Sequence, residues 1–247
     1  MKITAVKTHK ITTKDKNLHT IFDQYLPTLK EKSILAVTSK IVSISQGRVV
    51  SLTHADKDTL IEEESQFYLP RNENKYNVSL TITQNTLVAS AGIDESNSDG
   101  NYILWPQDPQ RAANDIRAYL QKKFHLKEIG VVITDSKTTP LRWGVTAIAI
   151  AFSGVEPLKN YVGSPDLFGR PFVYEKMSII DNLASAAALE MGEGNEQTPL
   201  AVIEDAKAVE FVAANPSVEE LGSLHIKPDE DLYAPLLQSV RWKKGKK

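Results

Sequence analysis

Apolar and polar residues follow one another along the chain in short segments that predict strands and helices in mixed order. Runs of apolar and β-branched residues predict strands at 2–11, 33–42, 47–52, 129–136, 145–155 and 199–205. The segment 33–42 is expected to be one buried strand, with 47–52 as its partner after a glycine turn. Residues 77–93 predict a β-hairpin that turns at Gln84 and Asn85, because polar residues there interrupt a β-branched alternation.

Two segments predict helices from apolar spacing and capping residues. In 108–125, Asp108 is a good N-cap and Pro109 suits the first helical position. Apolar residues gather on one face of this helix, at Ala112, Ala113, Ile116, Tyr119 and Leu120. In 178–192, Ser178 begins a variant capping box and Gly192 is placed to end the helix.

The order of these elements predicts the fold class. Mixed strand lengths, a hairpin and few regular strand-helix-strand units favour an α+β fold over a doubly wound parallel sheet. Mixed, largely antiparallel sheets with flanking helices are therefore expected. No linker divides the chain, so residues 1–247 are expected to form a single unit. Two interleaved subdomains are the alternative, and the sequence does not indicate their boundary.

Composition excludes several classes of function. The chain has 247 residues, a net charge of -2, five scattered histidines and no cysteine. Thiolate metal sites and cysteine nucleophiles are therefore excluded. Neither a nucleic-acid partner nor a membrane is expected, and a cytoplasmic location is the default. The one dense basic run, 241–247, is expected to be a frayed, solvated end.

Four segments share a pattern in which an apolar run leads into a turn rich in oxygen ligands, glycine or lysine. They are "TSKIVS" at 38–43, "GIDESN" at 92–97, "ITDS" at 133–136 and "MGEGNEQTP" at 191–199. Carboxylate and amide oxygens suit Mg²⁺ or Mn²⁺. If Asp94, Asp135 and Glu193 converge, two carboxylates ~4 Å apart repel by ~4 kcal/mol at an effective dielectric constant near 20. A bound divalent cation would remove that repulsion.

Each of these segments also has a purely local interpretation. Asp, Ser and Asn side chains make good turns and helix caps, which would explain 92–97 and Asp135 without any metal. Lys40 could be a solvated lysine, and 191–199 could be a helix end followed by a polar turn. The last segment is no P-loop, because its glycines follow a helix and do not precede one.

The four segments in this order, together with "GVEPLKNYVGSPDLFGRPF" at 154–172, resemble the coenzyme F420-0:gamma-glutamyl ligase family. The resemblance extends from about Ile34 to about Asp205. It implies an enzyme that uses GTP and two divalent ions, Mg²⁺ or Mn²⁺, to add L-glutamate to a carboxylate of a deazaflavin coenzyme precursor. The reaction passes through an acyl phosphate. The resemblance also implies an intertwined homodimer in which loops of both subunits line one site.

The same resemblance assigns roles to individual residues. Asp94 and Asp135 would hold the first metal ion, and Ser136 and Glu193 would reach the second. Asp94, Asp135 and Lys40 are the catalytic candidates. The nucleotide would contact Ser39, Lys40, Asn97 and the loop formed by Met191, Gly192, Glu193, Gly194, Asn195, Glu196, Gln197 and Thr198. A general base for the glutamate amine is not assigned.

The sequence departs from the family pattern at three places near the expected site. Ile44 stands where a second lysine is usual, and losing one charged hydrogen bond weakens binding by ~1.5–3 kcal/mol, or roughly 10- to 150-fold. Whether the enzyme uses GTP or ATP is therefore left open. Lys137, Thr138 and Thr139 replace the usual residues after the metal-ligand pair, although Arg142 remains. The N-terminal loop, "ITTKDKN", gives no nucleotide contacts.

Two functional hypotheses follow from these departures. In the first, the ligation is retained and the acceptor is the deazaflavin precursor or another metabolite ending in a carboxylate, such as a folate. In the second, the chain binds a nucleotide or metabolite without catalysing ligation. The first hypothesis leaves open how many glutamates are added.

Overall fold

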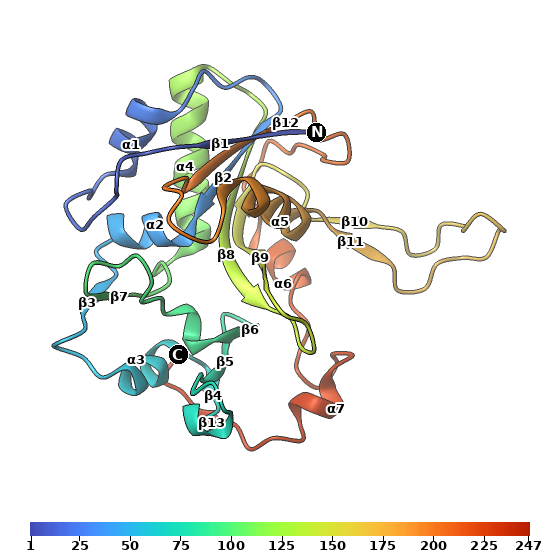
Figure 1. Cartoon of the computed structure of the whole chain (residues 1–247). Helices are drawn as coiled ribbons and strands as arrows, with labels where there is room; N and C mark the ends of the chain where they lie inside the picture. Colours follow the sequence, from blue (N-terminus) through green and yellow to red (C-terminus); the bar gives the residue numbers. More distant parts are fainter.

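A five-stranded sheet forms the centre of the larger part of the molecule in the computed structural model, which describes residues 1–247 (Figure 1). Its strands lie in the order β1 (Lys2–Val6), β12 (Leu200–Glu204), β2 (Ser33–Thr38), β8 (Ile129–Thr138) and β9 (Val145–Ser153). Only β2 and β8 are parallel, and all other neighbours are antiparallel. The α+β prediction is confirmed.

Helices cover both faces of this sheet, which explains why its central strands are apolar throughout. On β2, Leu35 and Val37 pack with α1 (Leu18–Tyr25) and α4 (Pro109–Phe124). The intervening Ile34 and Ala36 pack with α5 (Ile179–Met191) on the opposite face. Successive side chains of a strand point to opposite faces, so one apolar run serves both cores. No helix is both long and apolar enough to span a membrane.

A smaller unit with its own apolar cluster is inserted between β2 and β8. After α2 (Ser39–Ser45) the chain passes through β3 (Val49–Ser51), α3 (Lys57–Glu64), β4 (Phe67–Tyr68), η1 (Arg71–Glu73), β5 (Leu80–Thr83), β6 (Thr86–Ala89), η2 (Ser90–Gly92) and β7 (Asn101–Ile103). A four-stranded sheet, β13-β4-β5-β6, takes its edge strand β13 (Lys243–Lys244) from the end of the chain. Figure 1 shows the C-terminus beside α3 and β4.

The remaining elements lie after β9. The strands β10 (Leu158–Asn160) and β11 (Lys176–Ser178) form an arm that projects away from the sheet, with a long loop at its end (Figure 1). Two short helices, α6 (Val218–Ser223) and α7 (Ala234–Leu237), precede β13. The chain between β12 and α6 is held by the buried Arg117 of α4, which donates to the carbonyl oxygens of Val212 and Ala213.

Several sequence predictions are confirmed. The hairpin turns at Gln84 and Asn85, whose positive φ angles of 48° and 56° are those of a tight two-residue turn. The helix after Asp108 and the helix after Ser178 begin at these caps, and Gly192 follows the second helix. Strands form as expected at 129–136, 145–155 and 199–205, although β8 continues beyond Asp135 to Thr138.

Four predictions are wrong in part. The first strand ends at Val6 and does not reach residue 11. The strand expected at 33–42 ends at Thr38, and 39–45 is the helix α2, because a buried apolar run does not distinguish helix from strand. The strand β3 pairs with β7 and not with β2. The terminal basic segment is ordered, because β13 pairs with β4 and Lys247 pairs with Glu64.

Candidate functional site

A cavity of about 410 Å³ opens where β2 ends, beside residues 134–136 of β8. Its walls come from the start of α2, the loop after η2, β8 and the loop between α5 and β12. Every residue that the sequence singled out for metal, nucleotide or catalysis lines this cavity. They are Ser39, Lys40, Asn97, Asp94, Asp135, Ser136, Met191, Gly192, Glu193, Gly194, Asn195, Glu196, Gln197 and Thr198.

Lys40 and Asp94 form an ion pair across one side of the cavity. Because α2 begins directly after β2, Lys40 projects from its first turn, with Nζ 2.6 Å from Asp94 Oδ2. Lys40 also donates to the carbonyl oxygen of Ser96 at 2.9 Å, and the Ser96 amide donates to Asp94 Oδ1 at 2.7 Å. Burial opposes ionisation of Asp94, but Lys40 and Ser96 outweigh it and hold the pKa of Asp94 below its ordinary value.

Asp135 occupies the middle of the site, within β8. The pairing of β8 with β9 shifts register between Ile133 and Thr134, so a β-bulge lies just before Asp135. The indole N–H of Trp105 donates to Asp135 Oδ2. Burial raises the pKa of Asp135 to about 6, and the nearby charge of Asp94 adds to the rise, although hydrogen bonds from Trp105, Ser136 and Ser39 oppose it.

A second pair of oxygen ligands lies beside Asp135. The Ser136 hydroxyl donates to Glu193 Oε2 at 2.6 Å, which joins β8 to the loop after α5. The Asn97 amide donates to the carbonyl oxygen of Gly194 at 2.9 Å, which joins the same loop to the turn that holds Asp94. Three segments distant in sequence are thus connected at one edge of the cavity.

The donors are suited to hard divalent cations, because all of them are carboxylate or hydroxyl oxygens. Asp94 lies near Asp135, and Glu193 is bonded to Ser136. The expected convergence of Asp94, Asp135 and Glu193 is not a closed cluster, since no three Asp, Glu, His or Cys side chains are grouped closely enough to enclose an ion. Mg²⁺ commonly takes one or two carboxylates and completes its shell with water and phosphate oxygens, so this donor set fits such an ion.

The segment 8–11, which leads into the N-terminal loop 11–17, also lines the cavity. That the loop makes no nucleotide contacts stays a prediction. Thr8, His9, Lys10 and Ile11 contribute to the wall, and the Thr8 amide donates to the carbonyl oxygen of Gln197 at 2.9 Å. The segment 8–11 reaches the site because β1 pairs with β12, the strand that follows the 191–198 loop. This pairing joins the beginning of the chain to a strand near residue 200, so no local pattern in the sequence could reveal it.

Ile44 gives the cavity an apolar wall where the family pattern has a second lysine. Its side chain is 6% exposed and lines the cavity. Lys10 lines the same cavity and provides a positive charge from a different element. Lys137, by contrast, lies on β8 outside the lining residues, and Arg142 is exposed in the turn that follows.

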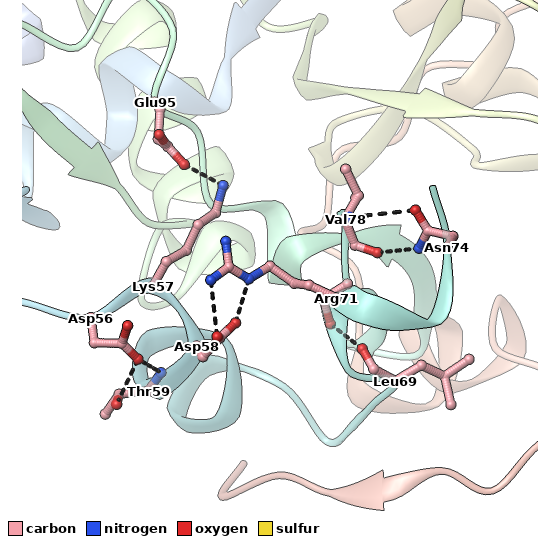
Figure 2. A network of polar contacts seen from close by, with 10 residues as sticks. Asp56, Lys57, Asp58, Thr59, Leu69, Arg71, Asn74, Val78 and Glu95 are labelled. Carbon is pink, nitrogen blue, oxygen red and sulfur yellow. Dashed lines mark hydrogen bonds and ion pairs between the residues drawn. The ribbon is translucent and has the colours of Figure 1, made fainter. Parts of the chain in front are cut away.

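Glu95 points away from the cavity although it lies between two lining residues. Its carboxylate pairs with Lys57 at the start of α3 (Figure 2), which ties the turn of Asp94 to the smaller unit. Beside this contact, a second polar cavity of about 420 Å³ lies against α3, where Arg71 binds Asp58 through two hydrogen bonds (Figure 2). Of the charged groups drawn there, Lys57 pairs with Glu95 and Arg71 with Asp58, while Asp56 accepts hydrogen bonds from Thr59.

Comparison with known proteins identifies relatives over most of the chain. The family described as F420-0:Gamma-glutamyl ligase matches residues 5–205. A protein of Methanopyrus kandleri named Coenzyme F420:L-glutamate ligase is 33% identical over 195 residues, which cover 72% of this chain and 77% of that protein. A protein of the same name from Methanocaldococcus jannaschii is 30% identical over 210 residues, covering 77% of this chain and 81% of the relative. The chain therefore belongs to the F420-0:gamma-glutamyl ligase family and is an amide-bond-forming ligase.

Proposed function

We propose that the protein is a GTP- and divalent-metal-dependent ligase that adds L-glutamate to a carboxylate of a coenzyme F420-0-like or folate-like acceptor. The observation that carries the proposal is the single cavity in which the Lys40–Asp94 pair, Asp135 and the Ser136–Glu193 pair face the 191–198 loop. Such a site combines a positive charge for phosphate oxygens with hard oxygen donors for cations. The relatives named Coenzyme F420:L-glutamate ligase support the glutamate and the acceptor.

The chemistry requires activation of the acceptor. A carboxylate oxygen of the acceptor bonds to the γ-phosphorus of GTP while the bond from that phosphorus to the bridging oxygen breaks, which releases GDP. The glutamate amine then attacks the acyl carbon and loses a proton, and inorganic phosphate departs. Lys40 is suited to stabilising the charge that develops on the transferred phosphoryl group.

Two divalent ions, Mg²⁺ or Mn²⁺, belong to this proposal. When bound, they would neutralise charge on the phosphate oxygens. Asp94 and Asp135 would hold one ion, and Ser136 with Glu193 would hold the other. Burial and the nearby charge of Asp94 raise the pKa of Asp135, so its ionised carboxylate is poorly stabilised by the protein alone. A bound cation would stabilise the ionised form, which supports this assignment.

The nucleotide is the part of the proposal most affected by local sequence. Ser39, Lys40, Asn97 and the loop 191–198 would contact it. Ile44 offers no charge to the phosphates, whereas Lys10 lines the same cavity and can offer one. A triphosphate could therefore keep its cationic contacts with a different arrangement of lysines, and GTP is proposed over ATP on the family pattern alone.

Ligation can be tested directly by mass. The protein is incubated with L-glutamate, GTP or ATP, Mg²⁺ or Mn²⁺, and either a coenzyme F420-0-type or a folate-type acceptor. The proposal expects a glutamate mass increment with GTP and metal, one phosphate released per glutamate, and no increment in EDTA. Nucleotide binding without any increment would support the alternative, a binding protein without ligase activity.

Matched variants make this assay specific for the cavity. Asp94→Asn should reduce turnover at least 100-fold, because it removes a proposed metal ligand and the partner of Lys40. Glu95→Gln removes a charge from the adjacent position of the same turn, but its carboxylate faces Lys57 (Figure 2), so turnover should change less than about threefold. Equal effects of the two substitutions would contradict the assignment of Asp94.

A homodimer is the second part of the proposal. The loop of the β10–β11 arm exposes Leu167 and Phe168 almost completely, at 98% and 94%, and the turn after β8 exposes Trp143 at 90%. Exposed apolar side chains in such numbers are typical of interaction surfaces. A second copy of the chain is the partner that would cover them.

A further inference from the structure

Trp105 is a buried aromatic residue whose indole reaches the site from the smaller unit. It follows β7 by two residues and is 3% exposed. The indole lies directly against Gly92 of the "AGIDESN" segment, where a Cβ atom on residue 92 would overlap the indole Nε1. Gly92 has a positive φ of 73° as well. Any side chain at residue 92 would therefore displace the indole.

The contact made by this indole is directional. Its N–H donates to Asp135 Oδ2. An indole is only a donor, since it has no lone pair to offer and does not ionise in the accessible pH range. A hydroxyl at the same place could rotate and either donate or accept. Trp105 can only donate to Asp135 Oδ2, and this contact constrains the rotation of the carboxylate.

Trp105 is also held from its backbone side. Arg48 Nε donates to the carbonyl oxygen of Trp105 at 3.1 Å, and Arg48 Nη2 lies 2.7 Å from Glu64 Oε1. The Glu64 side chain is 12% exposed, so this ion pair is shielded from water. The indole is thus fixed by a glycine on one side and by a buried ion pair on the other. Only the N–H is directed at the cavity wall.

We propose that Trp105 is a positioning residue that fixes the rotation of the Asp135 carboxylate for metal binding. This inference rests on the proposed function, because it takes Asp135 to be a metal ligand. Hydrogen bonds from outside the ligand shell orient ligating side chains, and their loss typically weakens metal affinity 10- to 100-fold. Gly92 belongs to the same device, since its missing side chain gives the indole its place.

The test is a Mn²⁺ titration of the full chain in the presence of GTP, with free Mn²⁺ counted by electron paramagnetic resonance. Trp105→Phe keeps an aromatic ring in the core but removes the N–H, and the dissociation constant should rise at least 10-fold. Gly92→Ala should raise it by a similar factor, because the indole must move. Trp242→Phe is the same exchange at a tryptophan outside the cavity, whose N–H donates to the carbonyl oxygen of Leu237, and it should leave the dissociation constant unchanged.

A purely structural role is excluded by a second variant. Leu104→Ala removes buried apolar contacts beside Trp105 and should lower the melting temperature at least as much as Trp105→Phe, yet it keeps the indole N–H. Its Mn²⁺ affinity should stay within about threefold of the unsubstituted protein. Wild-type affinity in Trp105→Phe, or an equal loss in Leu104→Ala, would overturn the inference alone. No Mn²⁺ binding by the unsubstituted protein would overturn the proposed function together with it.

Discussion

At the scale of single residues, Asp135 is a proposed metal ligand whose buried charge destabilises the folded protein. Burial raises its pKa from the ordinary 3.8 to about 6, so the folded protein holds this proton more tightly than the unfolded chain does. The stabilisation from the bound proton is complete below pH ~4, is lost as the pH rises to ~6, and stays lost above that. At neutral pH and without metal, the charged carboxylate therefore lowers the free energy of unfolding by roughly 1–3 kcal/mol.

Asp135→Asn should remove this penalty. In EDTA at pH 7.5 the variant should melt several degrees above the unsubstituted protein, at ~2–4 °C for each kcal/mol in a chain of this size. At pH 4 the difference should vanish. With Mn²⁺ and GTP the order should reverse, because only the carboxylate gains from the cation. Melting curves at both pH values decide the matter, and a gain that is equal at pH 4 and 7.5 would contradict the assignment to this proton.

The individual residues of the site were easier to identify from the sequence than the elements that carry them. Asp94, Asp135, Ser136 and Glu193 stand out because oxygen ligands follow apolar runs, and all four line one cavity. The roles of Trp105 and Gly92 were not predicted, because a tryptophan after a strand is usually a core residue and a glycine before a turn is explained by the turn. Their relation appears only when two segments are packed together.

At the scale of elements, the predictions succeeded where a signal was local and failed where pairing was distant. The hairpin at Gln84 and Asn85 and the helix after Asp108 are specified by adjacent residues. The helix α2 has only seven residues, of which five are buried, so it is too short for an apolar period to distinguish it from a buried strand. The pairings of β1 with β12 and of β13 with β4 span most of the chain and left no local pattern.

The strand β13 and the residues after it are held to the smaller unit by strand pairing and by ion pairs. Lys247 and Arg48 both pair with Glu64. Burial acts to raise the pKa of Glu64, but these two cations outweigh it and hold the pKa below its ordinary value. Its contribution to stability is therefore present at neutral pH and is lost as the pH falls through the folded pKa.

Glu64→Gln should destabilise the protein by about 2–4 kcal/mol at pH 7, because Arg48 is left shielded without its countercharge. Glu63→Gln, at a more exposed neighbouring position, should change stability by less than about 1 kcal/mol. Urea unfolding at pH 7 measures both values. Hydrogen exchange should show the amides of β4 and β5 opening first in the Glu64 variant. Equal midpoints for the two variants would contradict the role of the buried pair.

At the scale of the whole molecule, the cavity depends on the insertion of the smaller unit between β2 and β8. The sheet supplies Asp135 and Ser136, while the inserted segment supplies Asp94 and Asn97. Asn97 and Glu95 bind this turn to the 191–198 loop on one side and to α3 on the other. Movement of the smaller unit would therefore change the spacing of the proposed metal ligands. The α+β class was predictable, but this insertion was not, because it depends on pairing across distant segments.

The projecting arm is the feature that one copy of the chain leaves uncovered. We expect the unsubstituted protein to be a dimer at micromolar concentration by light scattering after size exclusion, because a second copy would bury Leu167 and Phe168. Phe168→Asp would place a charge in that interface and should give monomers, whereas Val218→Asp, at an exposed position of α6, should leave the dimer intact. A monomeric unsubstituted protein would contradict the proposed dimer. A dimer that tolerates Phe168→Asp would show that the arm lies outside the interface, so that another surface must join the subunits.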